Sequence, residues 1–85
     1  MSDHPTDFKG DVIAAIRDAV ESQIQGARAT VTGGGGHYTI EVVSPAFEGL
    51  NMLASHRLVL AAVAPLMKGD MAPVHAVDSV KTRTA

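Results

Sequence analysis

The chain has 85 residues, no cysteine and a formal net charge of −2. A chain of this length buries only about 60% of its unfolded surface, so we expect one domain spanning residues 1–85, with a modest core and no deep enzyme cleft. The missing cysteines exclude a disulfide framework, a zinc–thiolate centre and a nucleophilic thiol, and the charge argues against a broad electrostatic surface for nucleic acid. No apolar run approaches the roughly 20 residues of a membrane span and residues 1–5 lack signal-peptide features, so we expect a cytoplasmic protein without a membrane partner.

The first predicted element is an amphipathic helix over residues 8–25, preceded by a frayed terminus at residues 1–6. Asp7 or Asp11 could cap its start, because a short carboxylate can accept from the free N–H groups of the first turn. Gly26 suits the left-handed residue that ends many helices. We interpret this helix as a packing element without chemistry, because one apolar stripe is formed at a spacing of three or four by Ile13, Ile16, Val20 and Ile24.

Two adjacent strands are predicted over residues 28–32 and 38–43, where β-branched residues are frequent. In the second strand one face would carry Tyr38, Ile40 and Val42. Four consecutive glycines, residues 33–36, separate the strands, and they lack the lysine and the serine or threonine of a phosphate-binding loop. We predict a mobile hairpin loop without a fixed turn, which serves as a flexible connector or faces a partner.

A short turn and a second long helix should follow. Pro45 ends the second strand and residues 47–49 turn the chain. The helix, over residues 53–67, is apolar on almost every side, which predicts either burial between the sheet and the first helix or an exposed apolar patch that a partner covers. Pro65 should kink or tighten its last turn, because the proline ring displaces a helical hydrogen bond.

The third predicted strand runs from Val74 to about Thr84. Its alternation is interrupted, because His75 and Val77 share one face whereas Val80 and Thr82 have the opposite parity. One extra residue near 78–79, held in a β-bulge, would restore the register.

Catalytic residues are not indicated at any spacing that we recognise. The serines lack an elbow or a partner base, and the acidic residues are scattered without a pair, so we predict no enzyme. We interpret His56 as structural, packed against the sheet, and expect the neighbouring Arg57 to be exposed, where its planar fork suits a carboxylate or a phosphate.

Four segments, in this order and spacing, resemble the BolA family. They are residues 36–44, a phenylalanine–x–glycine turn at 47–49, a histidine–arginine–x–valine helix at 55–59 and a histidine–alanine–apolar triplet at 74–77. With the first helix they span nearly the whole chain. The resemblance implies an α/β fold of the class II KH-like type, with an αββαβ core, an extra turn before the second long helix and a three-stranded mixed sheet covered on one face by helices.

The resemblance also implies a metal-related role. The histidine that matches His75 is the family's ligand for a [2Fe–2S] cluster shared with a monothiol glutaredoxin and glutathione. The residue that matches His37 is the auxiliary ligand, and its identity groups the chain with the histidine-loop branch. The implied function is that of an adaptor that binds, senses or traffics a cluster in iron homeostasis, with none held by the isolated protein. Histidine in place of cysteine on one iron raises the cluster's potential.

Two other functions stay open at this point. Some family members resemble KH-like nucleic-acid-binding transcriptional regulators, which would make DNA a partner through Arg57, Lys68, Lys81 and Arg83. In KH modules a GxxG loop clamps the nucleic-acid backbone, and here residues 49–52 keep only the first glycine. The remaining function is a protein-interaction module whose histidines bind no metal. A weak homodimer is compatible with each of these readings.

Overall fold

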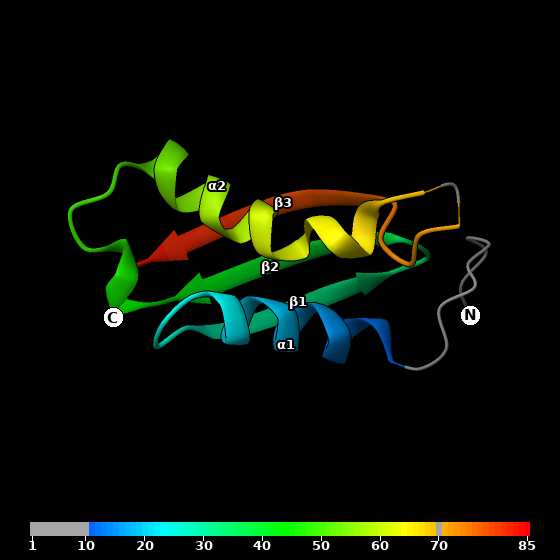
Figure 1. Ribbon diagram of the computed structural model, residues 1–85, viewed down its shortest axis with the longest axis horizontal. Helices are drawn as coiled ribbons and strands as arrows, with labels where there is room; N and C mark the ends of the chain where they lie inside the picture. The colour runs from blue at the N-terminus through cyan, green and yellow to red at the C-terminus, as the bar shows by residue number, and fades with distance from the viewer. Residues whose placement is uncertain (1–10, 70) are drawn as a thin grey trace.

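The computed structural model describes residues 11–69 and 71–85 (Figure 1). The order is αββαβ, as predicted, with a short 3-10 turn before the second long helix. Predictions for residues 1–10, which include the frayed terminus, a helix start at Phe8 and a cap by Asp7, lie outside the described residues. The elements are α1 (Val12–Gln23), β1 (Arg28–Gly34), β2 (His37–Val43), η1 (Pro45–Phe47), α2 (Met52–Val63), η2 (Ala64–Met67) and β3 (Ala76–Arg83).

The first helix has the cap that its sequence predicts, but its C-cap is Ile24 in an extended conformation, and the left-handed Gly26 lies two residues beyond it. Asp11 is the N-cap, and its carboxylate accepts a hydrogen bond from the backbone N–H of Ala14 at 3.1 Å. The helix ends at Gln23, two residues before the predicted end, and Gly26 follows with a φ of 68°. The apolar stripe points into the core, since Ile16, Val20 and Ile24 are all buried.

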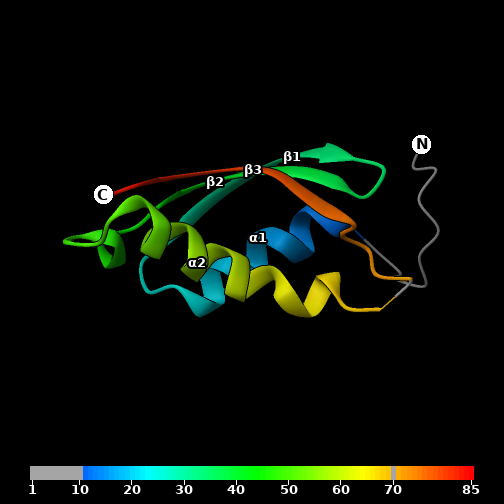
Figure 2. The ribbon, with the colours of Figure 1, turned by 90° about the horizontal axis from the view of Figure 1, so that it is seen from above.

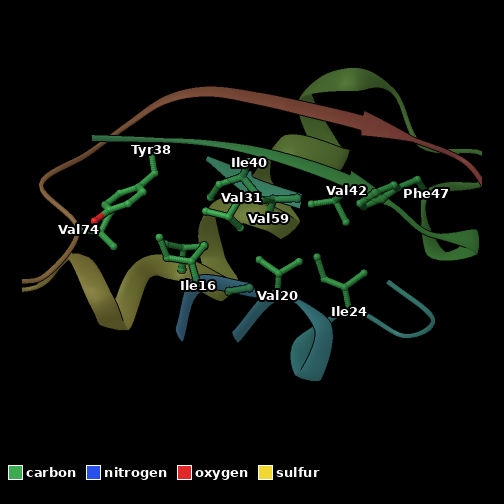
Figure 3. Packing of buried hydrophobic residues seen from close by; sticks show 12 residues of the cluster. Ile16, Val20, Ile24, Val31, Tyr38, Ile40, Val42, Phe47, Val59 and Val74 are labelled. Carbon is green, nitrogen blue, oxygen red and sulfur yellow. The ribbon is translucent and has the colours of Figure 1, made fainter. Parts of the chain in front are cut away.

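The sheet has the order β1-β2-β3, with β1 antiparallel and β3 parallel to β2. Both helices cover the same face of this mixed sheet, as Figure 2 shows, and the other face carries no element of the described chain. The core lies between the sheet and the helices, and Figure 3 shows its side chains pointing toward one another from the two layers. The residues of β2 predicted for the inner face, Tyr38, Ile40 and Val42, are 5%, 0% and 1% exposed.

The glycine run forms a defined turn, so the prediction of a mobile loop without a fixed turn was wrong. Gly33 and Gly34 belong to β1, and Gly34 pairs with His37 across the hairpin. Only Gly35 and Gly36 connect the strands, with φ values of 62° and 87°. A two-residue hairpin of the I′ type needs positive φ at both central positions, which glycine adopts without a steric cost.

The second helix is not sandwiched between the sheet and α1, as one interpretation of its sequence had it. The two helices lie side by side in one layer, with α1 packed on β1 and α2 packed on β3 (Figure 2). The inner face of α2 is completed by Val59 and Val63, whereas Leu58 and Leu60 are each 40% exposed. The surplus of apolar residues is therefore partly on the surface. At its end the helix tightens into η2, which contains Pro65, as predicted.

The third strand begins at Ala76 and not at Val74, so His75 precedes the strand instead of lying in it. The backbone N–H groups of His75 and Ala76 both bond to the carbonyl of Gly36, so regular pairing starts only afterwards. The predicted bulge is confirmed, because Tyr38 pairs with Val77 and Thr39 pairs with Ser79. The residue in between, Asp78, has no partner residue on β2.

Candidate functional site

The two candidate ligands, His37 and His75, come together at one end of the sheet. Their ring centroids are 5.4 Å apart and the ring planes are inclined by 56°. His37 is the first residue of β2, and His75 comes immediately before β3. Because β2 and β3 are parallel, both starts lie at the same end of the sheet, beside the hairpin turn (Figures 1 and 2). Both histidines are exposed.

The backbone fixes both histidines relative to each other. The Gly36 carbonyl accepts the N–H of His75 at 2.7 Å and that of Ala76 at 2.9 Å, which ties the turn before His37 to the segment that carries His75. Val74, which is fully buried, anchors the same segment in the core and donates its N–H to the carbonyl of Leu66 at 3.1 Å. The backbones that carry the two rings are therefore tied to each other and to the core.

A third side chain, that of Asp78, contacts His37. Its Oδ1 lies 3.2 Å from Nδ1 of His37, and the two side chains are 57% and 53% exposed. An ionised carboxylate can only accept a hydrogen bond, so in this geometry Nδ1 of His37 carries the hydrogen. With the hydrogen on Nδ1, the lone pair of the neutral ring lies on Nε2, to which no described residue bonds. An exposed ion pair contributes only about 0–1 kcal/mol to stability, so the contact matters for orientation.

The side chains at this site could supply some, but not all, of the ligands that a metal centre needs. Imidazole nitrogen is a good ligand for borderline metals such as iron and zinc. Within residues 11–69 and 71–85, no three or more side chains of His, Cys, Asp and Glu are grouped so as to hold a metal ion. An iron–sulfur cluster of the two-iron type takes four protein ligands, usually thiolates, and histidines can replace two of them on one iron. The residues present fit such a cluster only if another molecule supplies the thiolates.

Two of the four cations predicted for nucleic acid line a common groove. Lys81 and Arg83 line a groove of about 410 Å³ at the opposite end of β3 from His75, between that strand and the start of α2. Arg57 and Lys68 do not line it, since Arg57 lies on α2 and Lys68 follows η2.

His56, which we interpret as structural, is partly buried and lines the same groove beside β3. The helix that carries it, α2, packs on β3, and its Val59 and Val63 are fully buried.

Sequence reasoning did not identify Asp78 as part of the site. The slip in alternation located the bulge, but a side chain on a bulge has no fixed parity, so its direction cannot be read from the strand pattern. The signal that was present is the acidic residue at the bulge itself, at the same end of the sheet as two histidines.

Comparison with known proteins identifies the family to which this chain belongs. The sequence model of the family described as BolA-like protein matches residues 11–85. The chain belongs to the BolA family. BolA-like protein 1 of Homo sapiens is 39% identical over 85 aligned positions, which cover 88% of this chain and 59% of that protein. For BolA-like protein 1 of Bos taurus the identity is 38%, with 88% and 60% covered. The chain thus spans about three fifths of the length of these BolA relatives.

Solved BolA structures share the fold. A bolA protein homologue from Coxiella burnetii superposes with a TM-score of 0.73 at 33% identity, covering 88% of this chain and 92% of that one. BolA1 of Mus musculus gives a TM-score of 0.61 at 31% identity, with 89% and 67% covered. The BolA domain of SufE1 from Arabidopsis thaliana gives 0.72 at 24% identity, with 91% and 95% covered, and supports the fold alone. The α/β fold with αββαβ order and a three-stranded mixed sheet is thereby confirmed.

No helix in the described part of the chain combines the length and the apolar character that crossing a membrane requires.

Proposed function

We propose that this chain is a cytoplasmic BolA-type adaptor that pairs with a monothiol glutaredoxin and glutathione to bind, sense or traffic a [2Fe–2S] cluster in iron homeostasis. The observation that carries the proposal is the convergence of two exposed imidazoles, His37 and His75, at 5.4 Å. Two histidines brought together from distant parts of the chain, with the rings open to solvent, form a ligand pair that a partner can reach. The proposed role is binding and not catalysis.

The composition of the chain supports a division of the ligands between two proteins. The sequence has no cysteine, so this chain offers nitrogen ligands only. The cluster is the cargo, and the glutaredoxin and glutathione would supply its thiolates. Replacing thiolate by imidazole on one iron raises the reduction potential of a two-iron cluster. The adaptor would thus change the properties of the cargo as well as its location.

The two histidines are held in place by different contacts. His75 is held through its backbone by Gly36 and by the buried Val74 beside it, which suits the principal ligand. His37 starts β2 directly after the turn and is oriented through its side chain by Asp78, which suits the auxiliary ligand. The backbone of each histidine is held by hydrogen bonds or by pairing in the sheet, as precise ligand sites require.

The test is the visible absorption and circular dichroism spectrum of the protein mixed without oxygen with a cluster-loaded monothiol glutaredoxin and glutathione. We expect the wild-type protein to change the spectrum, His75→Ala to abolish the change and His37→Ala to reduce it. His56→Ala is the matched control, because this histidine lines the groove at the other end of β3, and it should behave as wild type. An unchanged spectrum with the wild-type protein, or an equal change with His75→Ala, would exclude the proposal.

A further inference from the structure

The β-bulge in β3 adds one residue to the strand and aims that residue at the site. Tyr38 and Thr39 are consecutive on β2, but their partners are Val77 and Ser79. Asp78 is therefore the extra residue, free of the sheet's alternation. Its carboxylate reaches across to Nδ1 of His37 at 3.2 Å. Bulges are known to redirect a side chain next to functional sites, and here the redirected side chain is the carboxylate at a candidate ligand.

The hydrogen bond determines which nitrogen of His37 is available. With Asp78 ionised, the shared hydrogen must lie on Nδ1, so the neutral ring has its lone pair on Nε2. An imidazole without a fixed partner favours the opposite tautomer, with the hydrogen on Nε2. Histidines that bind metals almost always donate their other N–H to a carboxylate, a carbonyl or water, and the loss of that outer partner costs roughly 10- to 100-fold in metal affinity.

We propose that Asp78 is a positioning residue that holds His37 in the Nδ1–H tautomer and presents its Nε2 to an iron carried by the partner. This inference rests on the proposed function for the identity of the metal. The orientation of the ring, however, is a property of the protein without its partner. It can therefore be measured separately.

The direct test is the tautomer of His37 in the free protein, read from long-range ¹H–¹⁵N spectra in mildly alkaline buffer, where imidazole is neutral. We expect the wild-type ring to carry its hydrogen on Nδ1, and Asp78→Ala to shift it toward Nε2. Asp78→Asn replaces the carboxylate by an amide, which can donate to Nδ1 as well as accept from it, so it should weaken the preference for the Nδ1–H tautomer. Asp18→Ala is the control for lost charge, because Asp18 is exposed on α1 and pairs only loosely with Arg17 at 3.7 Å. The same tautomer in wild type and Asp78→Ala, or an equal shift in Asp18→Ala, would overturn the inference.

A second measurement tests whether the contact of Asp78 with His37 affects binding of the cluster-loaded glutaredoxin. We expect Asp78→Ala to weaken the apparent affinity for the cluster-loaded glutaredoxin by roughly 10- to 100-fold, and to have no further effect once His37 is alanine. Equal losses in both backgrounds would overturn the positioning role, because Asp78 would then act without His37.

If the wild-type protein leaves the cluster spectrum unchanged, the proposed function fails, whereas a tautomer that depends on Asp78 would still establish the contact. If the spectrum changes but the tautomer and affinity are insensitive to Asp78, only this inference fails.

Discussion

At the scale of single residues, the geometry of the site depends on a glycine that takes no part in binding. Gly33 is in β1 with a φ of 127°, a conformation that residues with a side chain rarely adopt. A Cβ there would overlap the carbonyl oxygen of His37 and lie 2.9 Å from Cα of Tyr38, both of which are backbone atoms. Nothing in this contact can move aside without displacing β2. Gly34, by contrast, has open space where a Cβ would be.

We therefore expect Gly33→Ala to lower the free energy of unfolding by about 1–3 kcal/mol, because a strained backbone position costs about this much. It should also shift the amide resonances of His37. Gly34→Ala is the matched control and should be neutral or stabilising by up to about 1 kcal/mol, since its backbone is compatible with alanine. Urea unfolding and amide spectra of both variants provide the measurement. Equal free energies of unfolding for Gly33→Ala and Gly34→Ala would show that the close contact of Gly33 with the backbone of β2 does not constrain the hairpin.

His37 and His75 could be predicted as candidates from the sequence, but their proximity could not. It depends on the parallel pairing of β2 with β3 and on the double hydrogen bond to the Gly36 carbonyl, which ties His75 to the turn. Neither is encoded in the local pattern around either histidine. Asp78 was missed for a related reason, because its contact joins positions that are near each other only after the sheet has formed.

At the scale of elements, the alternation of apolar residues was sufficient to predict the bulge, whereas local chemistry predicted the hairpin but not the turn within it. In β3 the alternation of apolar residues changes parity once, and a single extra residue explains this change. The structure has this extra residue at Asp78. In the glycine run, four identical residues leave open which two make the turn. The cross-strand register decides this, and Gly35 and Gly36 form the turn.

The burial of α2 could not be predicted either. Its sequence is apolar on most sides, yet the buried face includes the small polar Ser55, whose hydroxyl donates to the Asn51 carbonyl at 3.0 Å. Two leucines, Leu58 and Leu60, are partly on the surface. Which face of a helix is buried depends on the position of the neighbouring helix in the layer, and α1 lies beside α2 and not above it.

Deletion of Asp78 tests whether the fold requires the β-bulge in β3. Without this residue Val77 and Ser79 become consecutive, and regular alternation would place Val77 and Val80 on the inner face, as they are now. We expect the shortened chain to fold with the same register and with a free energy of unfolding changed by less than about 1 kcal/mol, because only exposed contacts are lost. Cross-strand nuclear Overhauser effects between Ile40 and Val80 would verify the register. Failure to fold would mean that the bulge is a structural requirement.

At the scale of the whole molecule, the charge distribution argues against nucleic acid as the main partner. The net charge is −2, and of the four candidate cations only Lys81 and Arg83 line a common groove. A protein that contacts few phosphates binds weakly and with a shallow dependence on salt, because few counterions are released.

We accordingly expect duplex DNA to bind weakly, with a slope of log affinity against log salt no steeper than about −2. The double variant Lys81→Gln/Arg83→Gln should remove this binding, whereas Arg57→Gln/Lys68→Gln, with the same change in charge, should leave it nearly intact. Fluorescence anisotropy over a range of salt concentrations measures both. A steep slope that depends on all four cations would instead support a nucleic-acid-binding function.

The central claim, that this chain supplies nitrogen ligands to a cluster whose thiolates come from a partner, is tested most directly by pulsed electron paramagnetic resonance. The measurement uses the reduced complex of cluster, glutaredoxin and glutathione with this protein, in which only this protein carries ¹⁵N. We expect couplings of iron-bound nitrogen that change from ¹⁴N to ¹⁵N with this labelling and are lost in His75→Ala. A spectrum without bound nitrogen, or with couplings that are insensitive to labelling of this chain, would contradict it.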